Sequence, residues 1–459
     1  MWGLAILPVL GRQDCRPHTE TLYNAAAMRK LSNLAAALVV IAQLGCVTTM
    51  PNTHTDLNSA AERYVRLVLA LGEHDADYVD AYYGPPAWRD EVKAAKRGVH
   101  DILTDARTLR DEIAATPTPS DAMLALRRNY LQRQTEALIA RAEMLEGRKL
   151  TFDEESKALY DAVAPMHTEE YFQELNAAIE RELPGEGSIT DRLEAFRKDF
   201  IIPKEKLDDV FKAAIEGCRA RTLEHTSLPP GETFTVEYVT NKSWSGYNWY
   251  KGNFTSLIQV NTDLPIFVDR AIDLACHEGY PGHHVYNALL EKNLVKDRGW
   301  VEMTVYPLFS PQSLIAEGSA NYGIEIAFPA GERVAWEKEH LFPIAGLDPA
   351  RGEKYYRVQE LVAKTSYAGN EAARRYLNGE INADQAAEWM TKYALMSPPR
   401  AKQRVKFIDQ YRSYVINYNL GKDLVREYVE RHAGNDREKR WKVFIELLSS
   451  PRLPSSLTK

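Results

Sequence analysis

The feature that most constrains this chain is a cluster of histidines in the segment 272–287, which reads IDLACHEGYPGHHVYN. Three histidines and Glu278 fall within eight positions, from His277 to His284, although the 459-residue chain has only eleven histidines. Two imidazoles and a more distant carboxylate are a usual ligand set for catalytic zinc, which keeps one position open for water. In the helical H-E-x-x-H pattern the histidines lie one turn apart and the glutamate acts as general base. Here the residue four places after His277 is Pro281, so the second imidazole must come from His283 or His284.

This spacing predicts a deformed helix. On a straight helix, a step of six residues puts His277 and His283 on different faces, and the step of seven to His284 climbs roughly 10 Å. Ligand bonds of about 2 Å cannot bridge that distance. Pro281 lacks the amide hydrogen that would bond the carbonyl of His277, and the nearby glycines make unusual backbone dihedrals accessible. We therefore predict a bulge or break at 279–282, with His283 preferred as second ligand because it needs the smaller insertion.

Two less specific interpretations of the segment are a surface turn with chance histidines and a buried histidine pair held by hydrogen bonds. The apolar helical approach 271–276 and the glutamate next to His277 argue against both. We assign Glu278 as the general base, because a carboxylate beside a zinc-bound water can take its proton. Zinc lowers the pKa of such a water to about 7.

The motif resembles that of a known family. HEGYPGHH is similar to the H-E-x-x-P-G-H-H signature of the bacterial family of domain of unknown function eight-eight-five, which resembles the gluzincin metallopeptidases. The second family signature, an E-G-W-A-like block, has its counterpart in 317–320, with Tyr322 following. A third block near the C-terminus is matched only at Tyr418 and Gly421. The similarity extends loosely over 59–428.

The resemblance implies a mainly α, zincin-like helical metallopeptidase with a small β-sheet next to the metal-binding helix. It also implies Zn²⁺ as the cofactor, peptide-bond hydrolysis as the reaction, and a peptide or small protein as the substrate. Glu317 is the implied third ligand, since it lies 34 residues after His283, which suffices for a helix, a connection and a second helix that faces the first. Glu302 and Glu325 are the alternatives.

Such a hydrolase needs a hydrogen-bond donor for the oxyanion of the reaction besides the metal. Three candidates stay open: His284 if it is not a ligand, Tyr322 and Tyr418. Two other classes of protein fit the same ligands. A non-haem iron enzyme also uses two histidines and a carboxylate, and a cell-envelope protein could bind metal without peptidase activity. The position of Glu278 beside the first histidine favours the hydrolase.

Charge and cysteine content exclude two further classes. The net charge of -7 and the lack of a basic run with interleaved aromatic residues predict no nucleic-acid partner. Four cysteines are too few for a disulfide framework in a chain of this length. We expect Cys276, at the end of the apolar approach to His277, to be a core residue rather than a nucleophile or half of a disulfide.

The first 55 residues are expected to lie outside the fold. Met28 begins a short basic segment, the apolar run 34–44 follows, and Gly45 precedes Cys46. This order resembles a lipoprotein signal peptide, and the run is shorter than the about 20 residues that span a bilayer. A plain signal peptide or an uncleaved anchor is the alternative. We predict an extension upstream of the true start over 1–27, a signal peptide over 28–46 with Cys46 lipidated, and a tether over 47–55.

The lipidated protein is then expected in the bacterial cell envelope, in the periplasm or at the cell surface, where its lipid anchors it to a membrane. Residues 56–459 are predicted as one large, mostly helical domain, with a helical half 56–230 and a catalytic half 231–459. Alternating β-rich residues predict strands at 233–239 and 254–261. An edge strand there can pair with the extended backbone of a peptide, or the pair simply covers the core. Helical spacing predicts helices that include 91–114, 120–145, 154–164, 169–183 and 189–200, then 399–419 and 422–430 near the C-terminus.

Overall fold

The computed structural model describes residues 56–458. The predictions for 1–27, for the signal peptide 28–46 with Cys46, and for the tether 47–55 lie outside the described residues. Within the described part of the chain, no helix is both long and apolar enough to cross a bilayer.

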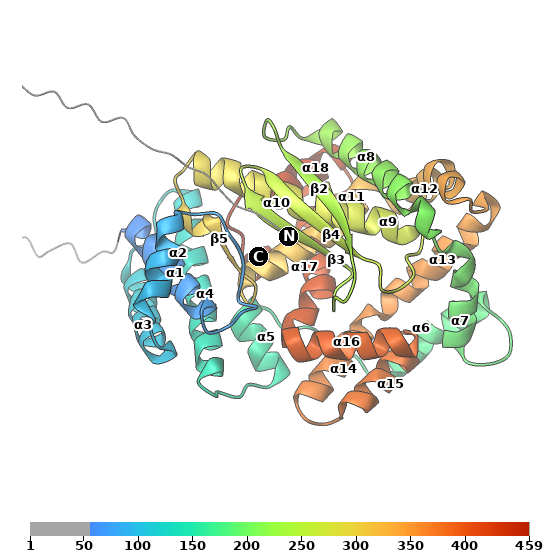
Figure 1. Ribbon diagram of the computed structural model, residues 1–459, viewed down its shortest axis with the longest axis horizontal. Coiled ribbons are helices and arrows are strands. Elements are labelled where there is room, and N and C mark those ends of the chain that lie inside the picture. The colour runs from blue at the N-terminus through green and yellow to red at the C-terminus, as the bar shows by residue number, and fades with distance from the viewer. Residues whose placement is uncertain (1–55, 459) are drawn as a thin grey trace, which may run out of the picture. The chain divides into compact units, whose positions relative to one another are not determined.

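Helices dominate the fold, as the sequence predicts, and only small sheets accompany them (Figure 1). Several helix starts are set by side chains: Asp56, Asp121 and Thr151 each accept a hydrogen bond from a backbone amide of the first turn. The predicted helix 91–114 is divided, because Lys96 adopts a left-handed conformation (φ 46°). The helices before the main sheet are α1 (Leu57–Gly72), α2 (Pro86–Ala95), α3 (Val99–Ala115), α4 (Ala122–Leu145), α5 (Phe152–Tyr160), α6 (Glu169–Glu182), α7 (Ile189–Arg197) and α8 (Leu207–His225).

The main sheet has three strands, with β4 (Thr255–Asn261) in the centre. β4 is parallel to β2 (Thr233–Val239) and antiparallel to β3 (Gly246–Gly252). The alternation of residues predicts β2 and β4 but not β3, whose sequence GYNWYKG does not alternate between polar and apolar side chains. A second, two-stranded sheet pairs β1 (Val79–Tyr82) with β5 (Val305–Pro307) in antiparallel orientation.

The main sheet lies against the histidine segment. β3 and β4 pack on α10 (His283–Leu290), and β3 also packs on the turn that precedes it (Figure 1). The segment enters through α9 (Asp269–Leu274). The remaining helices are α11 (Pro311–Ala327), α12 (Ala330–Ala345), α13 (Gly352–Ala363), α14 (Ala368–Leu377), α15 (Ala383–Tyr393), α16 (Pro398–Tyr411), α17 (Ile416–Ala433), α18 (Arg437–Leu448) and α19 (Pro454–Leu457).

α11 and α17 cross with their backbones in direct contact. A Cβ atom added at Gly318 would lie 2.4 Å from the backbone of Gly421, so both positions need glycine for the close approach. The sequence predicts a helix break near Gly421, but α17 runs through it. The break lies earlier, at Arg412, where the backbone adopts φ 53° after α16.

Two large hydrophobic cores hold the described residues together. One combines residues of α1 and α3 with residues of α14 and α16, and the other combines α8 with α10, α12 and α18. Each core therefore draws on residues from before and after position 230, and the two predicted halves share their packing.

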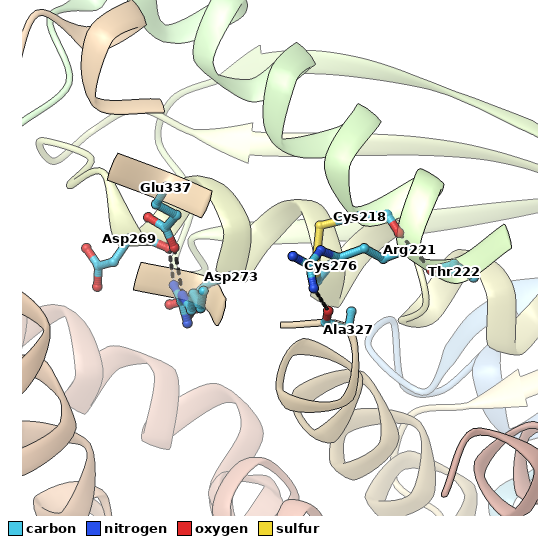
Figure 2. The surroundings of a disulfide bond; sticks show 9 residues. Cys218, Arg221, Thr222, Asp269, Asp273, Cys276, Ala327 and Glu337 are labelled. Atoms are coloured by element: carbon cyan, nitrogen blue, oxygen red, sulfur yellow. Dashed lines mark hydrogen bonds and ion pairs between the residues drawn. A yellow bond between two sulfur atoms is a disulfide. The ribbon is translucent and has the colours of Figure 1, made fainter. Parts of the chain in front are cut away.

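A disulfide joins Cys218 of α8 to Cys276, with a Cα–Cα distance of 5.6 Å (Figure 2). The prediction that Cys276 is not half of a disulfide is therefore wrong, although both cysteines are fully buried, as a core assignment requires. The two partners are 58 residues apart, so the pairing depends on how α8 packs in the fold and has no local signal. The bond fixes α8 to the residue directly before His277.

Candidate metal centre

The helix that carries the histidines is broken, as the spacing predicts. α9 ends at Leu274, a π-helical turn spans Ala275–Gly279, and α10 begins at His283. Within the break, the amide of Tyr280 donates to the carbonyl of Ala275 at 3.2 Å. Tyr280 itself is extended and precedes a cis bond to Pro281, so the prediction of a break at 279–282 is confirmed.

Gly282 lets the two parts of the broken helix approach each other. Its amide donates to the carbonyl of Cys276 at 2.9 Å, and a Cβ atom there would lie 1.9 Å from the carbonyl oxygen of His277. No side chain fits at that distance. The glycine therefore allows His283 to start a helix directly beside His277.

Three side chains converge at this junction: His277, His283 and Glu317 of α11. Their ligand atoms all lie within 4.8 Å of one another. Glu317 Oε2 is 3.2 Å from His277 Nε2 and 3.7 Å from His283 Nε2, and the imidazole centroids are 4.7 Å apart. The structure thus brings His283 rather than His284 to the cluster, together with the first-choice carboxylate.

The cluster has the chemistry of a metal site. Glu317 Oε1 accepts a hydrogen bond from Tyr414 Oη at 2.7 Å, whereas the buried Oε2 has no hydrogen-bond partner among the described residues. Burial opposes ionisation of Glu317, but the two imidazoles outweigh it and hold the pKa of Glu317 well below its ordinary value. Burial alone would lower the pKa of His283, but Glu317 raises it to about 9. A cation bound between two imidazoles and an ionised carboxylate would satisfy Oε2, and these residues fit zinc.

The alternative carboxylates are engaged elsewhere. Glu302 is fully buried in an ion pair with Arg127, at 2.6 Å. Glu325 pairs with Lys422 and Arg426 at 3.1 and 2.7 Å. Neither joins the cluster, which leaves Glu317 as the third ligand candidate.

Glu278 is buried beside the cluster and faces β3. A Cβ atom at Gly246 would lie 2.9 Å from Glu278 Oε1, and Asn248 Nδ2 donates to the Glu278 carbonyl at 2.7 Å. Burial raises the pKa of Glu278, while His277 and His283 oppose that rise. The absence of a side chain at Gly246 thus makes room for the carboxylate, and Asn248 fixes its backbone.

His284 faces away from the cluster. It is fully buried, and its ring nitrogens contact Ser256 Oγ at 2.9 Å and Glu232 Oε2 at 3.0 Å. Tyr280 Oη also donates to Glu232, at 2.6 Å. The predicted role of His284 as oxyanion donor is therefore wrong, because its two ring nitrogens contact Ser256 of β4 and Glu232, the residue directly before β2.

The two tyrosines predicted as oxyanion donors, Tyr322 and Tyr418, differ in their position relative to the cavity of the cluster. Tyr322 packs edge-on against Phe444 of α18, with centroids 5.6 Å apart, and does not line the cavity of the cluster. Tyr322 instead lines the larger adjoining cavity, and its role as oxyanion donor stays a prediction. Tyr418 lines the cavity, so of the three oxyanion candidates it is the one in a suitable position.

The cavity beside the cluster has a volume of about 630 Å³, within the usual range for ligand sites. Sequence reasoning missed several of its polar residues. Tyr414 bonds Glu317, Asp80 accepts a hydrogen bond from Tyr247, and burial raises the pKa of Asp80 to about 6. Arg404 also lines the cavity. Tyr414 lies one helical turn before Tyr418, a spacing that could have identified it; Asp80 and Arg404 have no comparable signal.

A second cavity of about 1230 Å³ adjoins the first. The two share wall residues, among them Trp244, Arg270, Asn321 and Arg400. The cavity of the cluster therefore continues into a larger open space.

Comparisons with known proteins give only distant likenesses. No family model matches the chain, and no curated protein matches its sequence. A candidate lipoprotein from Colwellia psychrerythraea is 16% identical, with a TM-score of 0.49 over 78% of this chain and 68% of that one. A candidate lipoprotein of unknown function from Shewanella oneidensis is 13% identical, with a TM-score of 0.41 over 87% and 84%. Metallocarboxypeptidase 1 of Trypanosoma cruzi is 14% identical, with a TM-score of 0.31 over 86% and 91%. Likeness at this level assigns neither a family nor an activity to the chain.

Proposed function

We propose that the protein is a zinc-dependent hydrolase of peptide bonds in the bacterial cell envelope. The observation that carries the proposal is the convergence of His277, His283 and Glu317 around one unpartnered carboxylate oxygen, with Glu278 beside them. The ligand set is that of catalytic zinc, with a position left for water. The HEGYPGHH resemblance to the family of domain of unknown function eight-eight-five supports the same activity.

The side chains around the cluster have distinct tasks in this proposal. A zinc ion at the cluster would supply Lewis-acid polarisation and an acidified water. Glu278 accepts the proton of the attacking water and passes it to the leaving amine. The hydroxyl of Tyr418 donates to the oxyanion that develops on the carbonyl oxygen. Tyr414 holds Glu317 in place through Oε1, which leaves Oε2 free to bind the metal.

β3 supplies a place for an extended substrate. It is an edge strand of the main sheet, and Gly246, Tyr247 and Asn248 line the cavity of the cluster. Free backbone groups of an edge strand can pair with a peptide backbone. A peptide added along β3 would pass Glu278, because Gly246 lies directly against that carboxylate.

The cellular location rests on separate observations. Disulfides persist in oxidising compartments such as the bacterial periplasm, and Cys218 is bonded to Cys276. The basic segment, apolar run and Gly45-Cys46 order supply the proposed lipid anchor.

The test combines metal analysis with peptide turnover. Protein purified without added metal is expected to contain one zinc per chain and to lose turnover of a mixed peptide library when a chelator removes the zinc. Glu278→Gln should keep the zinc and lose about 10²- to 10⁴-fold in rate, because the amide cannot accept a proton. Glu325→Gln is the matched control, since that carboxylate lies on the same helix as Glu317 but outside the cluster. Finding mainly iron, or a Glu278→Gln protein as fast as its parent, would refute the proposal.

A further inference from the structure

α16 presents two arginines to the cavity of the metal cluster, one helical turn apart. Arg404 lines the cavity of the cluster, and Arg400 lines both this cavity and the adjoining one. Both side chains are half-buried. Burial lowers the pKa of each guanidinium, so both are cations in a poorly solvated place.

Neither guanidinium has an anionic partner among residues 56–458. Arg404 stacks on the rings of Phe407 and Tyr418, at 4.5 and 5.5 Å from their centroids, and makes no ion pair with a described carboxylate. Arg400 donates only to the carbonyl of Pro265, at 3.0 Å, and lies over the ring of Phe267.

Other cations in the same walls are neutralised. Arg270 pairs with Asp273 at 2.8 Å, and Lys422 pairs with Glu325 at 3.1 Å. A desolvated charge without a partner is costly, and proteins normally pair it. The contrast indicates that the two arginines of α16 are kept for an anion that is not part of the chain.

Ring contacts place Arg404 next to the reacting centre. Its guanidinium lies over Tyr418, whose ring packs edge-on against Tyr414 at 5.8 Å. The hydroxyl of Tyr414 donates to the ligand candidate Glu317. Stacking on aromatic rings also fixes the plane of a guanidinium, which presents its donors in a fork suited to a carboxylate.

We propose that Arg404, with Arg400 behind it, binds a carboxylate of the substrate close to the scissile bond. The inference rests on the proposed peptidase function and names its substrate class. A carboxylate in this position has two sources in a peptide: the free carboxyl terminus, which makes the enzyme a carboxypeptidase, and the side chain of an aspartate or glutamate next to the cleaved bond.

Three N-acetylated tripeptides separate these sources. The first, Ac-Ala-Phe-Ala, ends in a free carboxylate, and the second, Ac-Ala-Phe-Ala-NH₂, ends in an amide. The third, Ac-Ala-Phe-Glu-NH₂, also ends in an amide but carries a glutamate as its last residue. Hydrolysis by the zinc-loaded full-length protein is measured as kcat/KM. We expect the free acid to be preferred over the first amide by about 10- to 100-fold, the range for a hydrogen bond to a charged group. A preference for the glutamyl amide alone would assign the pocket to an acidic side chain.

The arginine is tested by its effect on that ratio. Arg404→Gln should lower the ratio of kcat/KM for the preferred carboxylate substrate to kcat/KM for the plain amide by the same factor, and Arg404→Lys should recover part of that ratio. Lys422→Gln is the matched control, because it removes a paired cation from the same cavity and should leave the ratio as in the parent.

A binding measurement makes the result independent of turnover. The hydrolysis-deficient Glu278→Gln protein should bind the free acid at least tenfold more tightly than the amide in calorimetry, and adding Arg404→Gln should remove the difference. Equal hydrolysis of acid and amides by the parent would overturn the inference and leave the peptidase function standing. Preferential binding of the acid with no hydrolysis of any peptide would refute the peptidase function instead, and absence of both would refute both.

Discussion

The disulfide between Cys218 and Cys276 gives a prediction whose size follows from the structure. The bond closes a loop with a sequence separation of 58 residues. A cross-link of that span removes chain entropy from the unfolded state worth about 4 kcal/mol at 25 °C. For a domain of about 400 residues, the unfolding entropy near 60 °C is about 0.85 kcal/mol/K, so reduction should lower Tm by about 5 °C.

The effect of the disulfide on Tm is best measured by comparing the oxidised and reduced forms of the same parent protein. Thermal unfolding of the parent protein is followed by circular dichroism, at one scan rate, before and after reduction with a phosphine and alkylation of the thiols. This isolates the cross-link, whereas Cys218→Ser or Cys276→Ser alone also places a hydroxyl in the core, which has its own cost. The Tm of a protein that carries both Cys218→Ser and Cys276→Ser should not change when the reductant is added.

Zinc affinity is a second readout of the same bond. Because Cys276 precedes His277, loss of the cross-link frees the backbone at the first ligand, and a chelator competition should show weaker zinc binding in the reduced protein. An unchanged Tm on complete reduction would refute the entropy argument. Labelling of both cysteines in denatured but unreduced protein would show that the bond does not form.

Three further predictions concern single positions. Pro281→Ala should allow a more regular helix, draw the ligands apart and weaken zinc binding without unfolding the protein; equal zinc affinity in a chelator titration would refute this. Burial raises the folded-state pKa of Glu337 to about 7, although its partner Arg333 opposes the rise, so the folded protein binds the extra proton. The carboxyl group of Glu337 therefore contributes its full stabilisation to the folded state below about pH 4.5, and this contribution is lost as the pH rises to about 7. In denaturant titrations, Glu337→Gln should remove this decline, and parallel pH profiles would contradict the assignment. Gly318→Ala should destabilise the fold by about 1 to 3 kcal/mol, since its Cβ would meet the backbone of Gly421 at 2.4 Å; an unchanged midpoint of unfolding would show that the two helices can separate.

The histidine break was predictable because it follows from local geometry. Proline at 281 and the six-residue step between His277 and His283 exclude a straight helix whatever the rest of the chain does. β2 and β4 were also predictable, because alternation of polar and apolar residues indicates a strand with one buried face. Local rules therefore recovered the helical class, the break and two strands of the main sheet.

The missed features depend on contacts between distant segments. β3 has aromatic residues in succession, and it is a strand because β4 pairs with it. The role of His284 depends on Ser256 and Glu232, which the sheet brings to α10, and nothing in the motif distinguishes it from a residue that faces the substrate. Gly421 resembles a helix terminator in the sequence, whereas the fold uses it for the contact with Gly318.

The glycine contact between α11 and α17 also bears on how a substrate could enter. At Gly318 and Gly421 backbone lies against backbone, so no side chain at that point can rearrange to let the two helices slide or part. Glu317 lies one residue from that contact, so the carboxylate side of the cluster is rigid. β3 and α16 supply other walls of the cavity. α16 leads into α17 through the turn at Arg412, and it carries the two unpaired arginines. A peptide that binds Arg404 would therefore lie between α16 and this rigid side of the cluster.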